Sequence, residues 1–126
     1  YQNKKGISFF TKNDSNQQIG FMSHPKNYII KPHKHQKRET KIYLTTEVII
    51  LQKGKLRVDF YDNKKKYLFS VVIKKHEIVM LVHGGHGFKV LEPVKMLEIK
   101  QGPFVSNKDK VKFDEIDEKK IKIKKI

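Results

Sequence analysis

The sequence contains no cysteine, and only Arg38 and Arg57 are arginines among its 28 basic residues. Without cysteine the chain can form neither a disulfide nor a thiolate metal site, so any metal ion must be bound by histidine, carboxylate or water. No apolar run approaches the length needed to span a bilayer, and no signal-peptide pattern opens the chain. We therefore expect a soluble, cytoplasmic protein with no membrane partner.

The net charge of +15 raises the question of a nucleic-acid partner. Base reading and bidentate phosphate binding favour arginine, whose planar fork suits them better than a lysine ammonium does. The basic residues here are almost all lysines, and Asn and Ile are also frequent, which is typical of an AT-rich genome. We expect no nucleic-acid partner. A basic surface instead fits an anionic small substrate, because it raises the encounter rate.

A chain of 126 residues is the size of one domain. Short apolar runs separated by polar turns predict strands and no helix of ordinary length. The predicted strands are Ile7–Thr11, Gln18–Met22, Tyr28–Ile30, Ile42–Leu44, Glu47–Gln52, Lys55–Tyr61, Lys66–Ile73, Ile78–Val82, Phe88–Leu91 and Val94–Gln101. The sequence therefore predicts a single all-β domain over residues 1–126.

Alternation along Lys55–Tyr61 indicates one apolar and one polar face. The predicted buried residues are Leu51, Leu56, Val58, Phe60, Val79, Leu81, Val90, Leu97 and Ile99. The C-terminal residues 114–126 form a basic tail in which isoleucines alternate with lysines. This tail is either an edge strand, where lysine discourages further pairing, or a frayed end.

Two histidines precede a carboxylate and a glycine turn in the first half of the chain. His33 and His35 are separated by one residue, so in an extended strand both rings lie on one face and can bind a single point. Glu47 begins an apolar run that ends at Gly54. Further along, His86 lies in a glycine-rich turn that is sharp enough to direct an imidazole inward.

This order of His-x-His, Glu, Gly and a later His resembles the two motifs of the cupins, over roughly residues 28–104. The resemblance implies a double-stranded β-helix, the jelly-roll barrel of that superfamily, with a metal site at His33, His35, Glu47 and His86. Eleven residues separate His35 from Glu47, so Glu39 is the alternative carboxylate ligand. His83 is the alternative to His86, and His76, Glu77 and His83 are the next candidates.

Three imidazoles and one carboxylate suit a divalent Fe, Mn, Ni, Zn or Cu ion. Within the cupins, the chain resembles the small sugar epimerases and isomerases of bacterial polysaccharide pathways. That resemblance implies proton transfer on a nucleotide-linked keto sugar, with His33 or His35 as base. The acid is Tyr61, Tyr28 or Tyr43, and analogy with small cupins implies a homodimer. A non-catalytic sugar or small-molecule binding protein and a metal-dependent dioxygenase are the alternatives.

Overall fold

The structure is a computed structural model that describes residues 5–103, 105 and 109–125. Its described residues contain strands and short 3₁₀ turns but no α-helix, so the all-β class is confirmed. No helix in the described part of the chain, the 3₁₀ turns included, is long and apolar enough to cross a membrane. The chain divides into two compact units, Tyr1–Tyr43 and Leu44–Ile126, each of which is described by itself. The single domain over residues 1–126 stays a prediction.

The first unit contains one hairpin, formed by β1 (Gly6–Phe9) and β2 (Gly20–Ser23). The strands are antiparallel, with Ile7 opposite Met22, which confirms the predicted hairpin with shorter strands. The described residues from 24 to 46 form neither helix nor strand. The predicted strands Tyr28–Ile30 and Ile42–Leu44 are therefore wrong. Their apolar residues suggested strands, but no neighbouring strand pairs with them in the described part of the chain.

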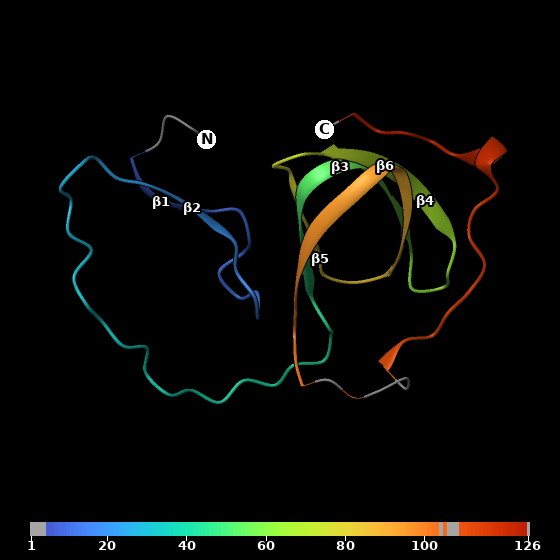
Figure 1. The fold of residues 1–126 in the computed structure, drawn as a ribbon. Helices are drawn as coiled ribbons and strands as arrows, with labels where there is room; N and C mark the ends of the chain where they lie inside the picture. The colour runs from blue at the N-terminus through green and yellow to red at the C-terminus, as the bar shows by residue number, and fades with distance from the viewer. Residues whose placement is uncertain (1–4, 104, 106–108, 126) are drawn as a thin grey trace. The chain divides into compact units, whose positions relative to one another are not determined.

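The second unit is built on the long strand β3 (Glu47–Tyr61). Along one side it pairs with β6 (Gly85–Lys100), and along the other with β4 (Tyr67–Lys74) and β5 (Ile78–Leu81), all antiparallel. Figure 1 shows β3 and β6 side by side. The breaks predicted after Gln52 and after Leu91 are wrong, because Gly54 lies inside the continuous strand β3 and Pro93 inside β6.

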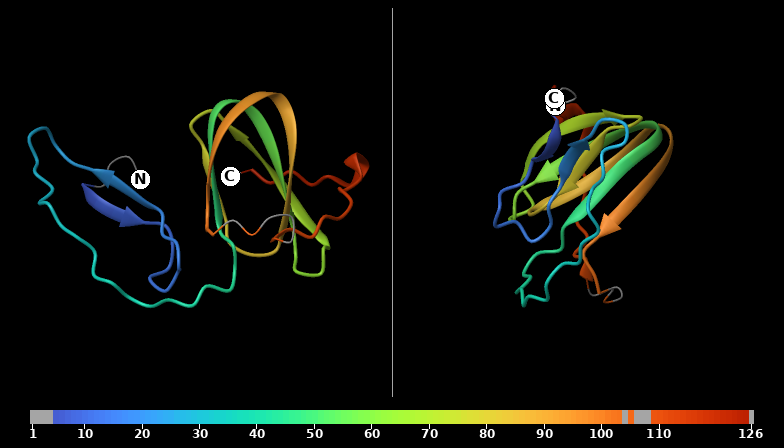
Figure 2. Two further views of the ribbon diagram at one scale, coloured as in Figure 1. Left: turned by 60° about the horizontal axis from the view of Figure 1, so that its bottom comes forward. Right: turned by 90° about the vertical axis from the view of Figure 1, so that its left-hand side faces the viewer.

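Strand β3 bends back on itself. A straight strand of its 15 residues would span about 45 Å. Leu81 pairs with Glu47 at the start of β3, whereas Gly85 pairs with Tyr61 at its end. Only residues 82–84 lie between Leu81 and Gly85, so the Cα atoms of these two residues are at most about 14 Å apart. The two ends of β3 therefore approach each other, and Figure 2 shows β3 and β6 arching together.

Gly54 lies at the bend of β3. Its φ of +85° is in the region that favours glycine, and a Cβ there would collide with the carbonyl of Pro93 on β6. The pairing of β3 with β6 shifts register between Leu51 and Leu56, as bulges in a bent pair of strands do. The bend folds the sheet so that its two halves enclose a core.

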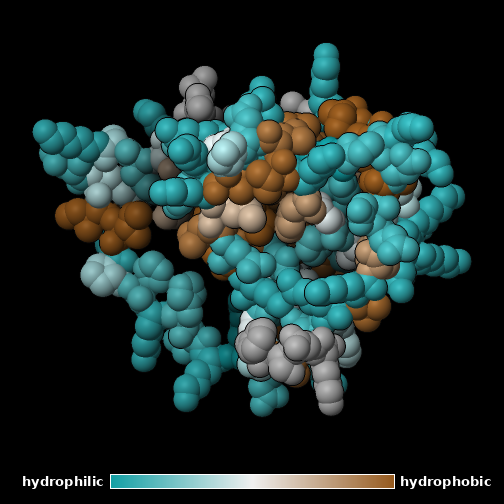
Figure 3. All heavy atoms as spheres, turned by 45° about the vertical axis from the view of Figure 1, so that its right-hand side comes forward, coloured by the Kyte–Doolittle hydropathy of each residue, from teal (hydrophilic) through white to brown (hydrophobic). Residues whose placement is uncertain are grey.

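The core lies inside this fold. It consists of Ile49, Leu51, Leu56, Val58, Val71, Ile73 and Leu81, with Phe60, Phe69, Val79 and Val94 packed against it. The predicted burial of Val90, Leu97 and Ile99 is wrong, because each is about half exposed. These residues lie on β6, which pairs only with β3 among the described strands, so the second edge of β6 has no neighbouring strand. Figure 3 shows apolar side chains exposed among hydrophilic ones.

The C-terminal residues 109–125 form a strap across the polar face of β3 and β4. Ser70 donates its N–H to the carbonyl of Lys122 and accepts from the N–H of Lys124, and it forms a parallel bridge with Ile123. The tail is therefore attached at the edge of β4 rather than frayed, up to residue 125; Ile126 lies outside the described residues. Among these strands no pairing joins β6 to β4 or β5. A closed jelly-roll barrel stays a prediction.

Candidate functional site

The bend of β3 brings Glu47 and His86 together. His86 lies opposite Phe60 near the end of β3, whereas Glu47 is the first residue of that strand. His86 Nε2 is 3.0 Å from Glu47 Oε2, and the Glu47 side chain is only 5% exposed against 28% for His86. A carboxylate only accepts hydrogen bonds, so in the neutral ring this contact places the proton on Nε2 and the lone pair on Nδ1. That lone pair can act as a base.

Three hollows meet at His86. The largest, of about 640 Å³, is also lined by Tyr61, Lys89 and residues 110–115 of the strap. A second, of about 440 Å³, is lined mainly by apolar residues that include Phe60, Phe69 and Met80. The third, of about 220 Å³, contains Glu47. His86 is therefore within reach of small molecules in any of the three.

The largest hollow is lined by as many basic as acidic residues. Arg57, Lys89, Lys110 and Lys112 face an equal number of acidic residues, Asp59, Asp114, Glu115 and Glu118. The net charge of +15 therefore acts on approaching anions from the surface as a whole. Binding of an anion inside the hollow needs a local site within this balanced lining.

Tyr61 lies at the end of β3, 6% exposed, and lines the two larger hollows. Its ring packs edge-on against Phe113 and Tyr67, and its hydroxyl accepts a hydrogen bond from the N–H of Ile116 at 3.1 Å. Burial raises the pKa of the Tyr61 phenol. Because its oxygen already accepts a hydrogen bond, the hydroxyl proton is available to a ligand. The alternative acids Tyr28 and Tyr43 are exposed.

His33 and His35 lie in the first unit and are exposed. They are not in a strand, yet their ring centroids are 5.4 Å apart in an edge-on arrangement. His33 Nδ1 is 3.0 Å from the carbonyl oxygen of Lys31. A carbonyl only accepts, so in the neutral ring this contact places the proton on Nδ1 and leaves the Nε2 lone pair for a ligand.

Without a proton on Nε2, the Glu47–His86 pair has the spacing of two ligands of one metal ion. Two ligand atoms about 2.1 Å from one ion and at about a right angle lie roughly 3 Å apart, as Nε2 and Oε2 do here. Lys110 Nζ is 3.7 Å from the other Glu47 oxygen, and this cation opposes a metal ion. Among the residues that the structure describes, no three His, Asp or Glu side chains are placed so that they could bind one metal ion. The four-residue metal site stays a prediction.

The alternative ligands lie elsewhere. Glu39 is exposed in the first unit, and His83 lines only the 440 Å³ hollow. His76 is in a turn with a φ of 72°, and Glu77 accepts a hydrogen bond from the N–H of Lys74. Glu47 and His86 were the first choices from the sequence, and they are the two that the structure brings together.

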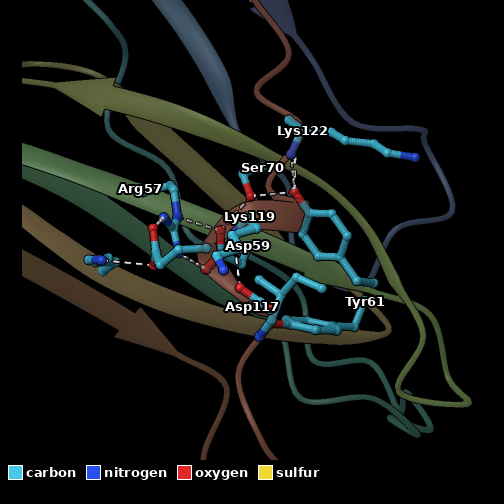
Figure 4. Close-up of polar contacts among 11 residues, drawn as sticks. Arg57, Asp59, Tyr61, Ser70, Asp117, Lys119 and Lys122 are labelled. Atoms are coloured by element: carbon cyan, nitrogen blue, oxygen red, sulfur yellow. Dashed lines mark hydrogen bonds and ion pairs between the residues drawn. The ribbon is translucent and has the colours of Figure 1, made fainter.

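A buried polar network was not predicted from the sequence. Arg57 Nε donates to Asp59 Oδ1 at 2.8 Å, and Ser70 Oγ donates to the same oxygen at 2.5 Å. Figure 4 shows this row of side chains beneath the strap. Arg57 also donates to Glu118, and these hydrogen bonds, with those to Asp59, raise the pKa of the guanidinium. The sequence did contain one signal for this network: Arg57 and Asp59 are two residues apart, and in a strand such residues lie on the same face.

The comparisons with known proteins leave the family open. No family model matches this chain, and neither a curated protein nor a solved structure is significantly similar to it.

Proposed function

We propose that this protein is a cupin-like enzyme that transfers a proton on a nucleotide-linked keto sugar in surface-polysaccharide biosynthesis. The observation that supports this proposal best is the imidazole of His86, held by a buried carboxylate at the junction of three hollows. A histidine paired with a carboxylate is a general base suited to neutral pH. The sugar class comes from the resemblance of the sequence to polysaccharide-pathway cupins.

In the proposed reaction, His86 Nδ1 takes the proton from the carbon next to the keto group. The C–H electron pair forms the carbon–carbon double bond, and the carbonyl π electrons move to oxygen, which gives an enolate. Tyr61 donates its phenolic proton to that oxygen. Return of a proton to the same carbon from the opposite face, with the enol hydroxyl giving its proton back to Tyr61, gives the epimer. Return of a proton to the former carbonyl carbon, with loss of the hydroxyl proton from the deprotonated carbon, gives the shifted ketone. His33 and His35, predicted as the base from the sequence, are the alternative to His86 in the same step.

Hydrogen exchange tests this chemistry before the product is known. Incubation with thymidine- or uridine-diphosphate 4-keto-6-deoxy sugars in deuterated water should place deuterium at C3 or C5, as detected by NMR. We expect His86→Asn to slow the exchange by about 10²–10⁴-fold. His83→Asn is the matched control, because His83 lines a hollow that His86 also lines and forms no ion pair among the described residues.

The same experiment assigns the base. An unchanged exchange rate in His86→Asn would overturn the role of His86. Loss of exchange in His33→Asn or in His35→Asn, made separately, would give the role to the first unit. Tyr61→Phe should reduce the exchange while leaving sugar binding in place.

A non-catalytic small-molecule binding protein is the second candidate, and the 440 Å³ hollow favours it. Its lining is mainly apolar, with Asp62 as its one acidic residue and no lysine or arginine. Such a hollow suits an uncharged ligand. Absence of exchange with every keto sugar, together with thermal stabilisation by a plain sugar, would support this function instead.

A further inference from the structure

Arg57 and Lys89 face each other across two neighbouring strands. They are direct register partners in the β3–β6 pair. Like charges directly opposite each other destabilise a sheet, so this pair needs an anion between or above its two cations. In the structure Glu118 of the strap supplies it.

Three donor nitrogen atoms, two of Arg57 and one of Lys89, bind the Glu118 carboxylate. Arg57 Nη1 and Nη2 donate to its two oxygens at 2.8 and 3.0 Å, and Lys89 Nζ is 2.7 Å from Oε1. This is the parallel two-bond geometry in which arginine binds both carboxylates and phosphates. The three donors therefore form a site for an oxyanion, whatever molecule carries it.

The cationic side of this site is fixed in place. The Arg57 side chain is 7% exposed, and Asp59 holds it from behind through Nε at 2.8 Å and Nη2 at 3.0 Å. Asp59 is itself held by Ser70. The guanidinium therefore keeps its orientation when the bound anion changes.

The anionic side is not fixed in the same way. The Glu118 side chain is 56% exposed and comes from η2 (Glu118–Lys120), a single 3₁₀ turn without buried residues. It lies 61 residues from Arg57 in the sequence. A half-exposed carboxylate on a short turn can exchange with another anion, because water can replace its hydrogen bonds when it leaves.

We propose that Arg57 and Lys89 form the phosphate site of this protein, and that Glu118 is an internal occupant which the phosphate of a ligand displaces. The 640 Å³ hollow contains Arg57, Lys89 and Glu118 together with His86. A diphosphate at the two cations therefore shares a hollow with the base. The ligand class, a nucleoside diphosphate carrying a sugar, rests on the proposed function; the oxyanion site rests on geometry alone.

Pyrophosphate binding, measured by calorimetry without any sugar, tests the site. Removing the internal competitor raises the fraction of the site that is free, so Glu118→Gln should bind pyrophosphate at least about ten-fold more tightly than the natural sequence. Lys89→Ala in the Glu118→Gln background should reverse the gain. Glu115→Gln is the matched control, because Glu115 lines the same hollow and no ion pair involves it among the described residues.

Two outcomes would overturn the site. One is equal pyrophosphate affinity in Glu118→Gln and the natural sequence, with both folded by circular dichroism. The other is a gain of the same size in Glu115→Gln, which would show a general charge effect. Should Glu118→Gln fail to fold, Glu118→Asp replaces it, since the shorter side chain loosens the same hydrogen bonds and should also tighten pyrophosphate binding.

The nucleotide part is tested with thymidine diphosphate. Binding tighter than that of pyrophosphate supports a nucleoside diphosphate, and equal binding limits the site to the phosphates and overturns the nucleotide part. Because no keto sugar is present, failure here leaves the exchange at His86 untouched. Loss of exchange would likewise leave a measured pyrophosphate affinity in place.

Discussion

Gly54 shows how one residue determines the position of the site. Its left-handed conformation lets β3 turn toward Pro93 without a steric conflict, and the turn brings Glu47 back to His86. A residue with a Cβ would meet both an unfavourable φ and the backbone of β6. The geometry of the candidate site therefore depends on a glycine that is not part of it.

We predict that Gly54→Ala lowers the free energy of unfolding by at least about 1–3 kcal/mol, from the strain at positive φ and the displacement of Pro93. Chemical denaturation measures it. Gly87→Ala is the matched control, because Gly87 has no positive φ and its nearest atom to a new Cβ, on Tyr61, lies at 3.9 Å. Equal losses in the two variants would show that the bend tolerates a side chain.

At the scale of single residues, the sequence predicted what local chemistry reveals. Glu47 and His86 were predicted because a carboxylate at a strand start and a histidine beside glycines are visible in short stretches. Arg57 was assigned to a polar face and missed, because its partner Glu118 lies 61 residues away. No local pattern indicates that the strap covers this face.

At the scale of elements, the sequence again predicted what local patterns specify and missed what depends on long-range pairing. The predicted strands Lys66–Ile73 and Ile78–Val82 match β4 and β5 to within one residue at each end. The interruptions predicted at Gly54 and Pro93 are bends instead, since the long-range pairing of β3 with β6 continues on both sides of each residue. Turn-forming residues mark a change of direction, and only the pairing partner decides whether the strand ends there.

The strap is an element attached largely through side chains, and its stability should depend on pH. Hydrogen bonds from Arg57, and then from Lys89, lower the pKa of Glu118 from 4.5 to about 2. A lowered carboxyl pKa gives stability that is fully present above the ordinary value of 4.5 and is lost as pH falls through about 2.

We therefore expect the difference in melting temperature between the natural sequence and Glu118→Gln to shrink as pH falls from neutral toward about 2. Thermal unfolding followed by circular dichroism measures both proteins. Glu115→Gln is again the control and should show no such convergence. A difference that stays constant down to the lowest pH would mean that the ionised form of Glu118 does not hold the strap.

At the scale of the whole molecule, the predicted ligands belong to different units. His33 and His35 lie in Tyr1–Tyr43, and Glu47 and His86 lie in Leu44–Ile126. In the first pair the His33 and His35 rings lie close together and His33 Nδ1 contacts the carbonyl of Lys31, and in the second Glu47 lies beside His86. The second edge of β6 has no partner among the described strands, so barrel closure and the homodimer stay predictions for the same reason.

The metal prediction is tested on the full chain. If His33, His35, Glu47 and His86 bind one ion, protein purified without chelator or affinity-tag nickel should contain about one divalent Fe, Mn, Ni, Zn or Cu ion per chain by elemental analysis. The double change His33→Ala and His35→Ala should abolish it, and Glu47→Gln should weaken it. His24→Ala is the control, because it removes a histidine of the first unit that is not among the predicted ligands. Full retention of the metal without His33 and His35 would place the ligands elsewhere, with His76, Glu77 and His83 to be changed next.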